Sequence, residues 1–409
     1  MAKNRDLVVG LDIGTTKICC VIADVGGDGI DIIGLGSHPS QGLRKGVVVN
    51  IEATVESIKA AVEEAETMAG QEIESVYVGV AGGHIKGLNS HGVIAVKGSE
   101  VTQHDVERVI DAAKAVNIPM DREVIHVLPQ EFIVDGQDGI LKPIGMRGVR
   151  LEAKVHIVTA AVTSAQNIVR SVNRAGLEVD DIVVEQLASA EASLDDDEKE
   201  IGVGLVDMGG GTCDIALYIK GAIKAISVVA LGGENITNDI AIGLRTPNHE
   251  AEKIKRQFGC ALSTMVSDDE IIDVPGVGGR EPRQVYRRVL AEIIEPRVEE
   301  IFMLVKREIE LSGNLGHMAS GLVLTGGTSI LQGIPEIAEE IFNMPARRGF
   351  PRKISGLMDL VNSPQYATAV GLILHGAKDH KAGGRRQIKG RNMFDKVLGR
   401  MKEWVKDFF

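Results

Sequence analysis

Two aspartates at the ends of apolar segments have the surroundings that best suit ligand chemistry. Asp12 and Asp207 lie half a chain apart, and each precedes a turn rich in glycine and threonine. Backbone N–H groups and threonine hydroxyls in such turns can surround a phosphate, and two carboxylates can hold a hydrated Mg²⁺. One glycine turn is weak support, because an ordinary β-hairpin has one too, but two matched turns favour phosphate binding. The turn residues are Gly14, Thr15, Thr16 and Lys17 after Asp12, and Gly209, Gly210, Gly211 and Thr212 after Asp207.

A third glycine turn follows the apolar segment 322–324 and consists of Gly326, Gly327, Thr328 and Ser329. A strand, a tight turn and a helix in this order would place a nucleotide at the N-terminus of the helix. The same pattern also occurs in ordinary strand-to-helix connections. Its position after the second aspartate turn favours the binding role.

The elements that must position these turns occur twice. Apolar runs at residues 7–11 and 203–206 predict strands that end at the two aspartates, and each turn leads into a second strand. This repetition indicates an internal duplication.

Two further stretches lie outside the repeated pattern. Residues 84–159 carry turns, polar strands and one helix but no phosphate turn, so they predict an inserted subdomain. Core-like elements resume with a strand over 155–162. A long helix is expected over 283–312, although Pro296 is a potential break.

Composition limits the class of protein. The 409 residues suffice for two or three domains. The four cysteines form no CxxC pair, which favours a reducing compartment. We expect no signal peptide, and no membrane span, because no segment reaches about 20 consecutive apolar residues.

Charge is unevenly distributed along the chain. Residues 378–407 hold ten Lys/Arg and four Asp/Glu, so this end carries +6 and the rest of the chain −18, for a net charge of −12. The acidic body would repel nucleic acid, so no nucleic-acid partner is expected, and the basic end would meet any anionic surface.

Residues 391–409 have the period of an amphipathic helix, after a polar, basic stretch that reads as a flexible linker over 377–390. The pattern suits a helix lying on an anionic lipid membrane. A helix folded back onto the body is the alternative. The apolar positions expected to enter the lipid are Phe394, Val397, Leu398, Met401, Trp404, Val405 and Phe408.

Five ordered motifs resemble those of the actin, Hsp70 and sugar-kinase superfamily. Residues 12–17 and 207–214 are similar to its two phosphate motifs, and residues 324–329 to its adenosine motif. Residues 185–190 and 366–372 resemble its two connecting segments. The resemblance implies an actin-like α/β fold, in which two RNase-H-like lobes surround an ATP cleft.

The resemblance also implies residue roles. Asp12 and Asp207 would bind Mg²⁺ through water, and Glu185 would orient a water for at most weak ATPase activity. Gln186 follows it, where many relatives have proline. Further contacts to ATP or ADP would come from Gly14, Thr15, Thr16, Lys17, Gly209, Gly210, Gly211, Thr212, Gly232, Gly233, Glu252, Lys255, Gly326, Gly327, Thr328 and Ser329.

Within the superfamily the chain resembles the FtsA family of bacterial cell-division proteins, through the insertion, the helix near 283–299 and the terminal amphipathic segment. The implied domains are 1–83 with 160–195 (first lobe), 84–159 (insertion), 196–225 with 302–376 (second lobe), 226–301 (small subdomain), 377–390 (linker) and 391–409 (membrane helix).

That resemblance implies a peripheral adaptor on the cytoplasmic face of the inner membrane at the division site. It would tether polymers of the tubulin-like FtsZ, form filaments with itself, and recruit later divisome proteins through residues 84–159. The FtsZ C-terminal tail would meet Arg283, Arg287, Arg288 and Arg297.

Three other members of the superfamily are alternatives. A small-molecule kinase would need an acceptor-binding signature, which we do not find. An Hsp70-like chaperone would need a substrate domain after residue 376, where too few residues remain. A pilus adaptor like PilM would share the core, but the terminal amphipathic segment favours the FtsA family.

Overall fold

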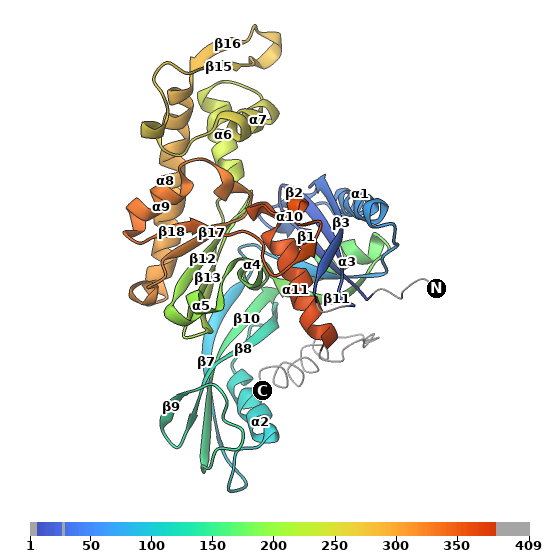
Figure 1. Ribbon diagram of the computed structural model, residues 1–409, viewed down its shortest axis with the longest axis vertical. Helices are drawn as coiled ribbons and strands as arrows, with labels where there is room; N and C mark the ends of the chain where they lie inside the picture. The colour runs from blue at the N-terminus through green and yellow to red at the C-terminus, as the bar shows by residue number, and fades with distance from the viewer. Residues whose placement is uncertain (1–5, 27–28, 382–409) are drawn as a thin grey trace.

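The computed structural model describes residues 6–26 and 29–381. The amphipathic segment 391–409, with the seven side chains expected to enter the lipid, lies outside the described residues. Figure 1 presents two central lobes side by side, a small subdomain at one end of the long axis and the insertion at the other. In the described part of the chain, no helix is both long and apolar enough to cross a membrane.

The first lobe is built on a six-stranded sheet in the order β11-β6-β1-β2-β3-β19. Helices cover both faces of it, which explains why its central strands are apolar throughout. α1 (Ile51–Ala69) packs on one face, while α11 (Ala367–Lys381) and α4 (Glu185–Ser193) pack on the other. The strands are β1 (Leu7–Ile13), β2 (Lys17–Asp24), β3 (Asp31–Pro39), β6 (Ser75–Val80), β11 (Glu178–Val184) and β19 (Ser355–Gly356), with the short pair β4 (Leu43–Arg44) and β5 (Val47–Val48) beside them.

Local sequence sets the ends of α1. The side chain of Asn50 accepts a hydrogen bond from the N–H of Ala53, and Gly70 ends the helix with φ 62°, a conformation that favours glycine. Buried residues between these caps recur every three or four positions, so one face of the helix meets the sheet.

The second lobe repeats the first. Its sheet runs β18-β17-β12-β13-β14, with the same parallel and antiparallel pairs as β11-β6-β1-β2-β3. This confirms the predicted duplication. The strands are β12 (Val203–Met208), β13 (Cys213–Ile219), β14 (Ala222–Val229), β17 (Leu322–Thr325) and β18 (Ala346–Arg348), and the helices around them are α5 (Asp196–Ile201), α8 (Arg287–Leu311) and α9 (Ile334–Phe342). The short helix α10 (Met358–Val361) packs against β3 of the first lobe.

The insertion forms its own four-stranded sheet, β7-β10-β8-β9, covered by α2. The expected core-like strand over 155–162 was wrong: residues 150–161 form one strand of the insertion that pairs with β7 and β8, and α3 (Val162–Arg174) follows directly. An apolar run alone does not reveal which sheet a strand joins. The elements are β7 (Lys86–Ala95), α2 (Gln103–Lys114), β8 (Arg122–Val134), β9 (Gln137–Ile140) and β10 (Arg150–Ala161).

The insertion contacts both lobes. The Gln130 amide donates to the Ile223 carbonyl oxygen of β14 at 2.7 Å. On the other side, the N–H of Val184 in β11 donates to Nε2 of His126 in β8 at 3.1 Å. The insertion therefore bridges β11 of the first lobe and β14 of the second.

The small subdomain comprises α6 (Gly233–Gly243), α7 (Asn248–Phe258) and the pair β15 (Ile271–Val274) and β16 (Arg283–Tyr286), beside the first half of α8. The expected helix over 283–312 begins later, at Arg287, because residues 283–286 pair with β15. Pro296 does not break it; the proline is exposed and α8 continues to Leu311.

The expected linker also begins later than residue 377. α11 continues to Lys381, and Ala377 is buried against the first lobe. The buried face of α11 therefore extends into the polar and basic stretch that begins at residue 377. Composition alone placed the start of the linker too early.

Candidate functional site

A cavity of about 540 Å³ lies between the lobes, where the turn after β1 faces the turn after β12. Most of the residues singled out in the sequence line it. They are Asp12, Gly14, Thr15, Thr16, Lys17, Glu185, Asp207, Gly209, Gly210, Gly211, Thr212, Gly233, Glu252, Lys255, Gly326, Gly327 and Thr328.

The two glycine-threonine turns have the same geometry and touch each other. The N–H of Gly14 donates to the Lys17 carbonyl oxygen at 3.1 Å, and the N–H of Gly209 donates to that of Thr212 at 2.9 Å. A Cβ added to Gly210 would lie 1.8 Å from Oγ1 of Thr16, so only glycine fits at this contact. The duplicated motifs therefore meet face to face across the lobe boundary.

Four carboxyl groups gather in the cavity: Asp12, Glu185, Asp207 and Asp214. Burial raises the pKa of Asp12 to about 7, with Lys17 lowering it and Asp207 raising it further. Burial also raises the pKa of Asp214 to about 7, helped by repulsion from Asp207 and opposed by its hydrogen bond from Thr212. For Glu185, burial and then repulsion from Asp12, Asp214 and Asp207 place the pKa well above its usual range.

Hydroxyl and amide groups hold two of these carboxylates in place. Oδ2 of Asp207 accepts from the hydroxyls of Ser189 and Thr368, the latter at 3.1 Å. These bonds oppose the effect of burial, which raises the pKa of Asp207. Asp214 accepts from the Gln186 amide at 2.6 Å and from the Thr212 hydroxyl at 2.8 Å. Gln186 thus fixes the orientation of a carboxylate.

Lys17 does not pair directly with a carboxylate. Its Nζ donates to the Gln365 carbonyl oxygen at 2.8 Å and lies 4.1 Å from the centre of the Tyr366 ring. Two of its three N–H donors are therefore left for other acceptors. Glu185 has one oxygen open to a ligand in the same way: within the described residues, its buried Oε1 has no hydrogen-bond partner.

The Glu252–Lys255 pair of α7 lines the cavity from the small subdomain. Nζ of Lys255 lies 2.7 Å from Oε2 of Glu252 and donates to the Gly233 carbonyl oxygen at 2.9 Å. These contacts join the start of α6 to α7, which places the small subdomain against the mouth of the cavity.

The third glycine turn differs from the expectation in part. Gly326 has φ 82°, and a Cβ there would lie 2.3 Å from Oδ1 of Asp207, so the turn approaches the carboxylates closely. A short 3₁₀ segment over Gly327–Ile330 follows it, and α9 begins only at Ile334. The N-terminus of that α-helix therefore does not directly follow the turn.

Two expected cofactor residues are not among the residues that line the cavity. Ser329 is fully buried, and its Oγ donates to the Gly326 carbonyl oxygen at 2.7 Å, which closes the turn. Gly232 precedes α6 and packs on the Gly209 turn, where a Cβ would lie 2.6 Å from the Gly209 carbonyl oxygen. Ser329 and Gly232 therefore support the two turns that line the cavity without lining it themselves.

The sequence reasoning missed several lining residues. Ile13, Asp214 and Thr368 could have been found, since they lie in motifs that the sequence shows, but the other positions carry no distinctive local pattern. The missed residues are Ile13, Gly46, Ala81, Asp214, Glu234, Arg256, Gln257, Gly259, Arg287, Ile330, Leu331, Gln332, Gln365 and Thr368.

The four arginines expected to meet a peptide do not share one surface. Arg287 lines the cavity and donates to the Phe258 carbonyl oxygen, Glu270 and Gln332. The others lie elsewhere on the small subdomain and α8: Arg283 donates to the Leu244 carbonyl oxygen at 2.7 Å, Arg288 pairs with Asp268 and Glu292, and Arg297 pairs with Asp239 and Glu300.

Comparison with known proteins assigns the family. The family model described as "Cell division protein FtsA" matches residues 204–371, and the one described as "SHS2 domain inserted in FTSA" matches residues 82–159. A cell division protein FtsA from Pseudomonas aeruginosa is 50% identical to the chain over 413 residues, covering 100% of this chain and 99% of that protein.

Two solved structures share the fold at low sequence identity. The PilM-PilN type IV pilus biogenesis complex matches with a TM-score of 0.66 at 18% identity, covering 91% of this chain and 99% of that one. MreB5 of Spiroplasma citri bound to ADP matches with a TM-score of 0.57 at 14% identity, covering 93% and 99%. These two show the actin-like fold alone, while the full-length identity to FtsA shows the family. The chain belongs to the FtsA family of bacterial cell-division proteins.

Proposed function

We propose that the cavity between the lobes binds ATP or ADP together with Mg²⁺. The observation that carries this proposal is the contact of two glycine-threonine turns beside four buried carboxyl groups. The turns would surround the phosphates, and Lys17 has N–H donors left for them. Glu252 and Lys255 would contact the ribose, and the turn at Gly326 the adenine side. The ADP in the MreB5 structure of the same fold supports this assignment.

The residues of the cavity fit a divalent cation. Four carboxyl groups in one buried space repel one another, and a cation among them would offset that repulsion. Oxygen ligands and retained waters suit Mg²⁺, so Asp12 and Asp207 would hold it through water. When bound, Mg²⁺ supplies positive charge to the phosphates and to these carboxylates.

We expect ATP hydrolysis to be weak at most. Glu185 would orient the attacking water, but burial and the neighbouring carboxylates raise its pKa, which favours its protonated form while the cavity holds no cation. The two hydrogen bonds to Asp214 hold that carboxylate in place and leave it less free to replace Glu185.

Calorimetric titration of the full chain with ATP, with and without Mg²⁺, tests the nucleotide site. We expect Mg²⁺ to strengthen ATP binding at least about tenfold in the native protein, and Asp207→Asn to remove that gain. Glu56→Gln on the exposed side of α1 is the control, because its side chain is 75% exposed. A native protein that binds ATP equally well without Mg²⁺, or not at all, would contradict the proposal.

We propose further that the chain is a membrane adaptor of cell division. It would tether FtsZ polymers to the cytoplasmic face of the inner membrane at the division site, as a peripheral protein that also forms filaments with itself. Family membership and the apolar period of residues 391–409, with Trp404 and Phe408 on one face, support this role. The insertion would contact later divisome proteins; Met120, Val149 and Leu141 are exposed apolar side chains on it.

The FtsZ C-terminal tail would dock on the small subdomain. The side chain of Arg288 is 45% exposed, beside exposed Tyr286 and Val289, so it is open to an acidic peptide. Arg287 is better explained by the cavity that it lines. A peptide whose affinity is unchanged by Arg288→Glu would remove this residue from the docking site.

Flotation with anionic liposomes in the presence of Mg²⁺ and ATP tests the adaptor role. The full chain should rise with the liposomes, and a version ending at Gly390 should stay in the soluble fraction. If both versions stay soluble, the terminal segment does not bind lipid and the adaptor proposal fails, while the nucleotide titration stands independently.

A further inference from the structure

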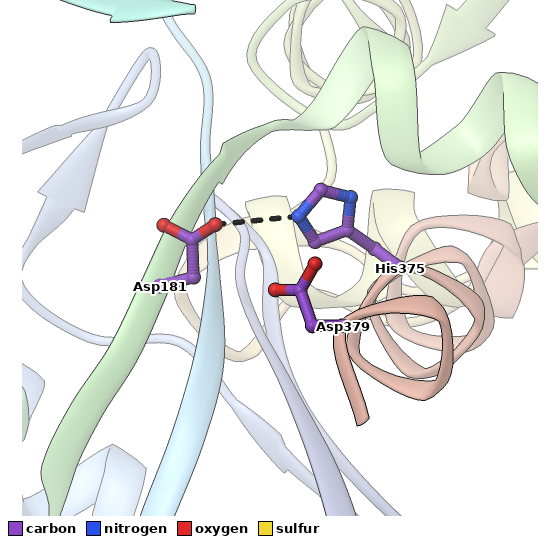
Figure 2. A group of neighbouring side chains, drawn as sticks. All are labelled: Asp181, His375 and Asp379. Carbon is purple, nitrogen blue, oxygen red and sulfur yellow. Dashed lines mark hydrogen bonds and ion pairs between the residues drawn. The ribbon is translucent and has the colours of Figure 1, made fainter. Parts of the chain in front are cut away.

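A cluster of one histidine and two aspartates lies outside the nucleotide cavity, at the boundary between β11 and α11. Asp181 comes from the strand, while His375 and Asp379 come from the helix, and Figure 2 shows all three side chains converging. One potential ligand atom from each lies within 4.8 Å of the other two. None of the three lines the nucleotide cavity.

The local structure explains why the three side chains meet. His375 and Asp379 are four positions apart in α11, so they share one face of the helix. Gly376 allows that face to approach the sheet, since a Cβ there would lie 2.6 Å from ring atom Cε2 of Tyr77. Nε2 of His375 then lies 3.3 Å from Oδ2 of Asp181.

Groups around the cluster fix the orientation of two of its members. Oδ1 of Asp181 accepts a hydrogen bond from the N–H of Ile182 at 2.5 Å, and the other oxygen faces His375. The His375 ring meets the Tyr77 ring edge to face, with centroids 6.1 Å apart. Supporting contacts of this kind orient the ligands of metal sites in proteins.

We propose that Asp181, His375 and Asp379 bind a divalent transition-metal ion of the Zn²⁺ class. Zinc binds histidine, cysteine and carboxylate ligands, and catalytic zinc sites use three protein ligands and a water molecule in the fourth position. Two ligands of a tetrahedral zinc ion at its usual bond lengths lie about 3.4 Å apart, which matches the 3.3 Å between His375 and Asp181. Aspartate and imidazole together suit Zn²⁺ better than Mg²⁺ or Ca²⁺, which prefer oxygen alone.

The charge of the cluster agrees with this assignment. Asp181 is only 2% exposed, and a cation beside it would offset part of the cost of burying its charge. Imidazole binds a metal through the lone pair of a ring nitrogen, and Nε2 of His375 is the atom that faces Asp181. The two carboxylates would balance the charge of a divalent cation.

The alternative is that His375 and Asp181 form only a hydrogen-bonded pair that attaches α11 to the sheet. The two possibilities differ in one property, stoichiometric metal binding. A bound ion would fasten the last turn of α11, which ends at Lys381, to β11.

Titration of the full chain with Zn²⁺ distinguishes them. The buffer would contain excess Mg²⁺, which occupies sites built from oxygen ligands, and no nucleotide. We expect one tightly bound Zn²⁺ per chain in the native protein, and binding at least about tenfold weaker in His375→Gln and in Asp379→Asn. Co²⁺ in place of Zn²⁺ would give visible absorption of a four-coordinate site in the native protein and not in the variants.

His249→Gln is the matched control, because His249 lies 3.2 Å from Glu250 but its side chain is 71% exposed. It should bind Zn²⁺ like the native protein. Circular dichroism with a chelator present would show whether each variant is folded. If His375→Gln does not fold, Asp379→Asn is the variant that tests the proposal. Native-like Zn²⁺ binding by a folded His375→Gln or Asp379→Asn variant, equal loss in His249→Gln, or no stoichiometric binding by the native chain would overturn the proposal.

Discussion

Replacing Asp12 with asparagine should stabilise the protein as the pH rises, provided that nucleotide and metal are absent. Burial raises the pKa of Asp12 from 3.8 to about 7 in the folded chain. Between these two values the folded state keeps a proton that the unfolded state has lost. The stability contributed by this group is therefore complete below pH 3.8 and is lost as the pH rises through 7. The loss is about 1.4 kcal/mol per pH unit, or about 3 kcal/mol between pH 5 and pH 7.

Asparagine carries no such proton, so the variant should not lose this contribution. Urea unfolding at several pH values from 5 to 8, with a chelator present, measures the free energy of unfolding of both proteins. The variant should gain about 3 kcal/mol relative to the native chain across that range. Glu56→Gln, on an exposed side chain, should follow the native curve. A difference between Asp12→Asn and the native protein that stays constant from pH 5 to pH 8 would refute the reasoning.

Three further substitutions test the contacts that shape the cavity and join the subdomains. Gly210→Ala should weaken ATP binding at least about tenfold in calorimetric titration, because the new Cβ would lie 1.8 Å from Oγ1 of Thr16 and keep the turns apart. Arg297 and Asp239 form two hydrogen bonds at 2.5 and 3.2 Å, so a double-mutant cycle of their alanine variants should give a coupling of about 1 kcal/mol in unfolding experiments; additive effects would contradict it. Gln130→Ala should cost about 1–3 kcal/mol in stability, because it leaves a buried carbonyl oxygen of β14 without its donor at 2.7 Å; thermal unfolding unchanged from the native protein would count against the bridge between the insertion and the second lobe.

The duplicated turns could be predicted from sequence because their signals are local. An apolar strand that ends in an aspartate and a glycine turn is read from a few consecutive residues, and its recurrence at Asp207 specifies a shared topology. The recurrence of the motif suggested that the two turns face each other. Which residues touch, Gly210 and Thr16, depends on how the two lobes pack. The family resemblance added the nucleotide roles of Glu252 and Lys255, which no spacing of charges could supply.

Other features could not be predicted because they depend on contacts between distant segments. Helix α8 begins at Arg287 and not at residue 283 as expected, because residues 283–286 pair with β15. Nothing within those four residues distinguishes a strand from a first helical turn. The family resemblance placed Arg287 on a peptide-binding surface, but its side chain lines the cavity. Asp181 and His375 are almost half a chain apart, so only the packing of α11 on β11 brings them together.

Helix α11 of the first lobe contacts both sites, the nucleotide cavity between the lobes and the His375 cluster. At its start the hydroxyl of Thr368 donates to Asp207 in the nucleotide cavity, and two turns later His375 faces Asp181. Glycine contacts fix the helix between these points: a Cβ on Gly371 would lie 1.8 Å from the Ala188 carbonyl oxygen of α4. A helix held this closely moves as a unit, because packed interiors do not deform continuously. If Asp207 shifts when a nucleotide binds, the Thr368 hydroxyl is the contact through which α11 would follow, and a metal ion at His375 would oppose that movement.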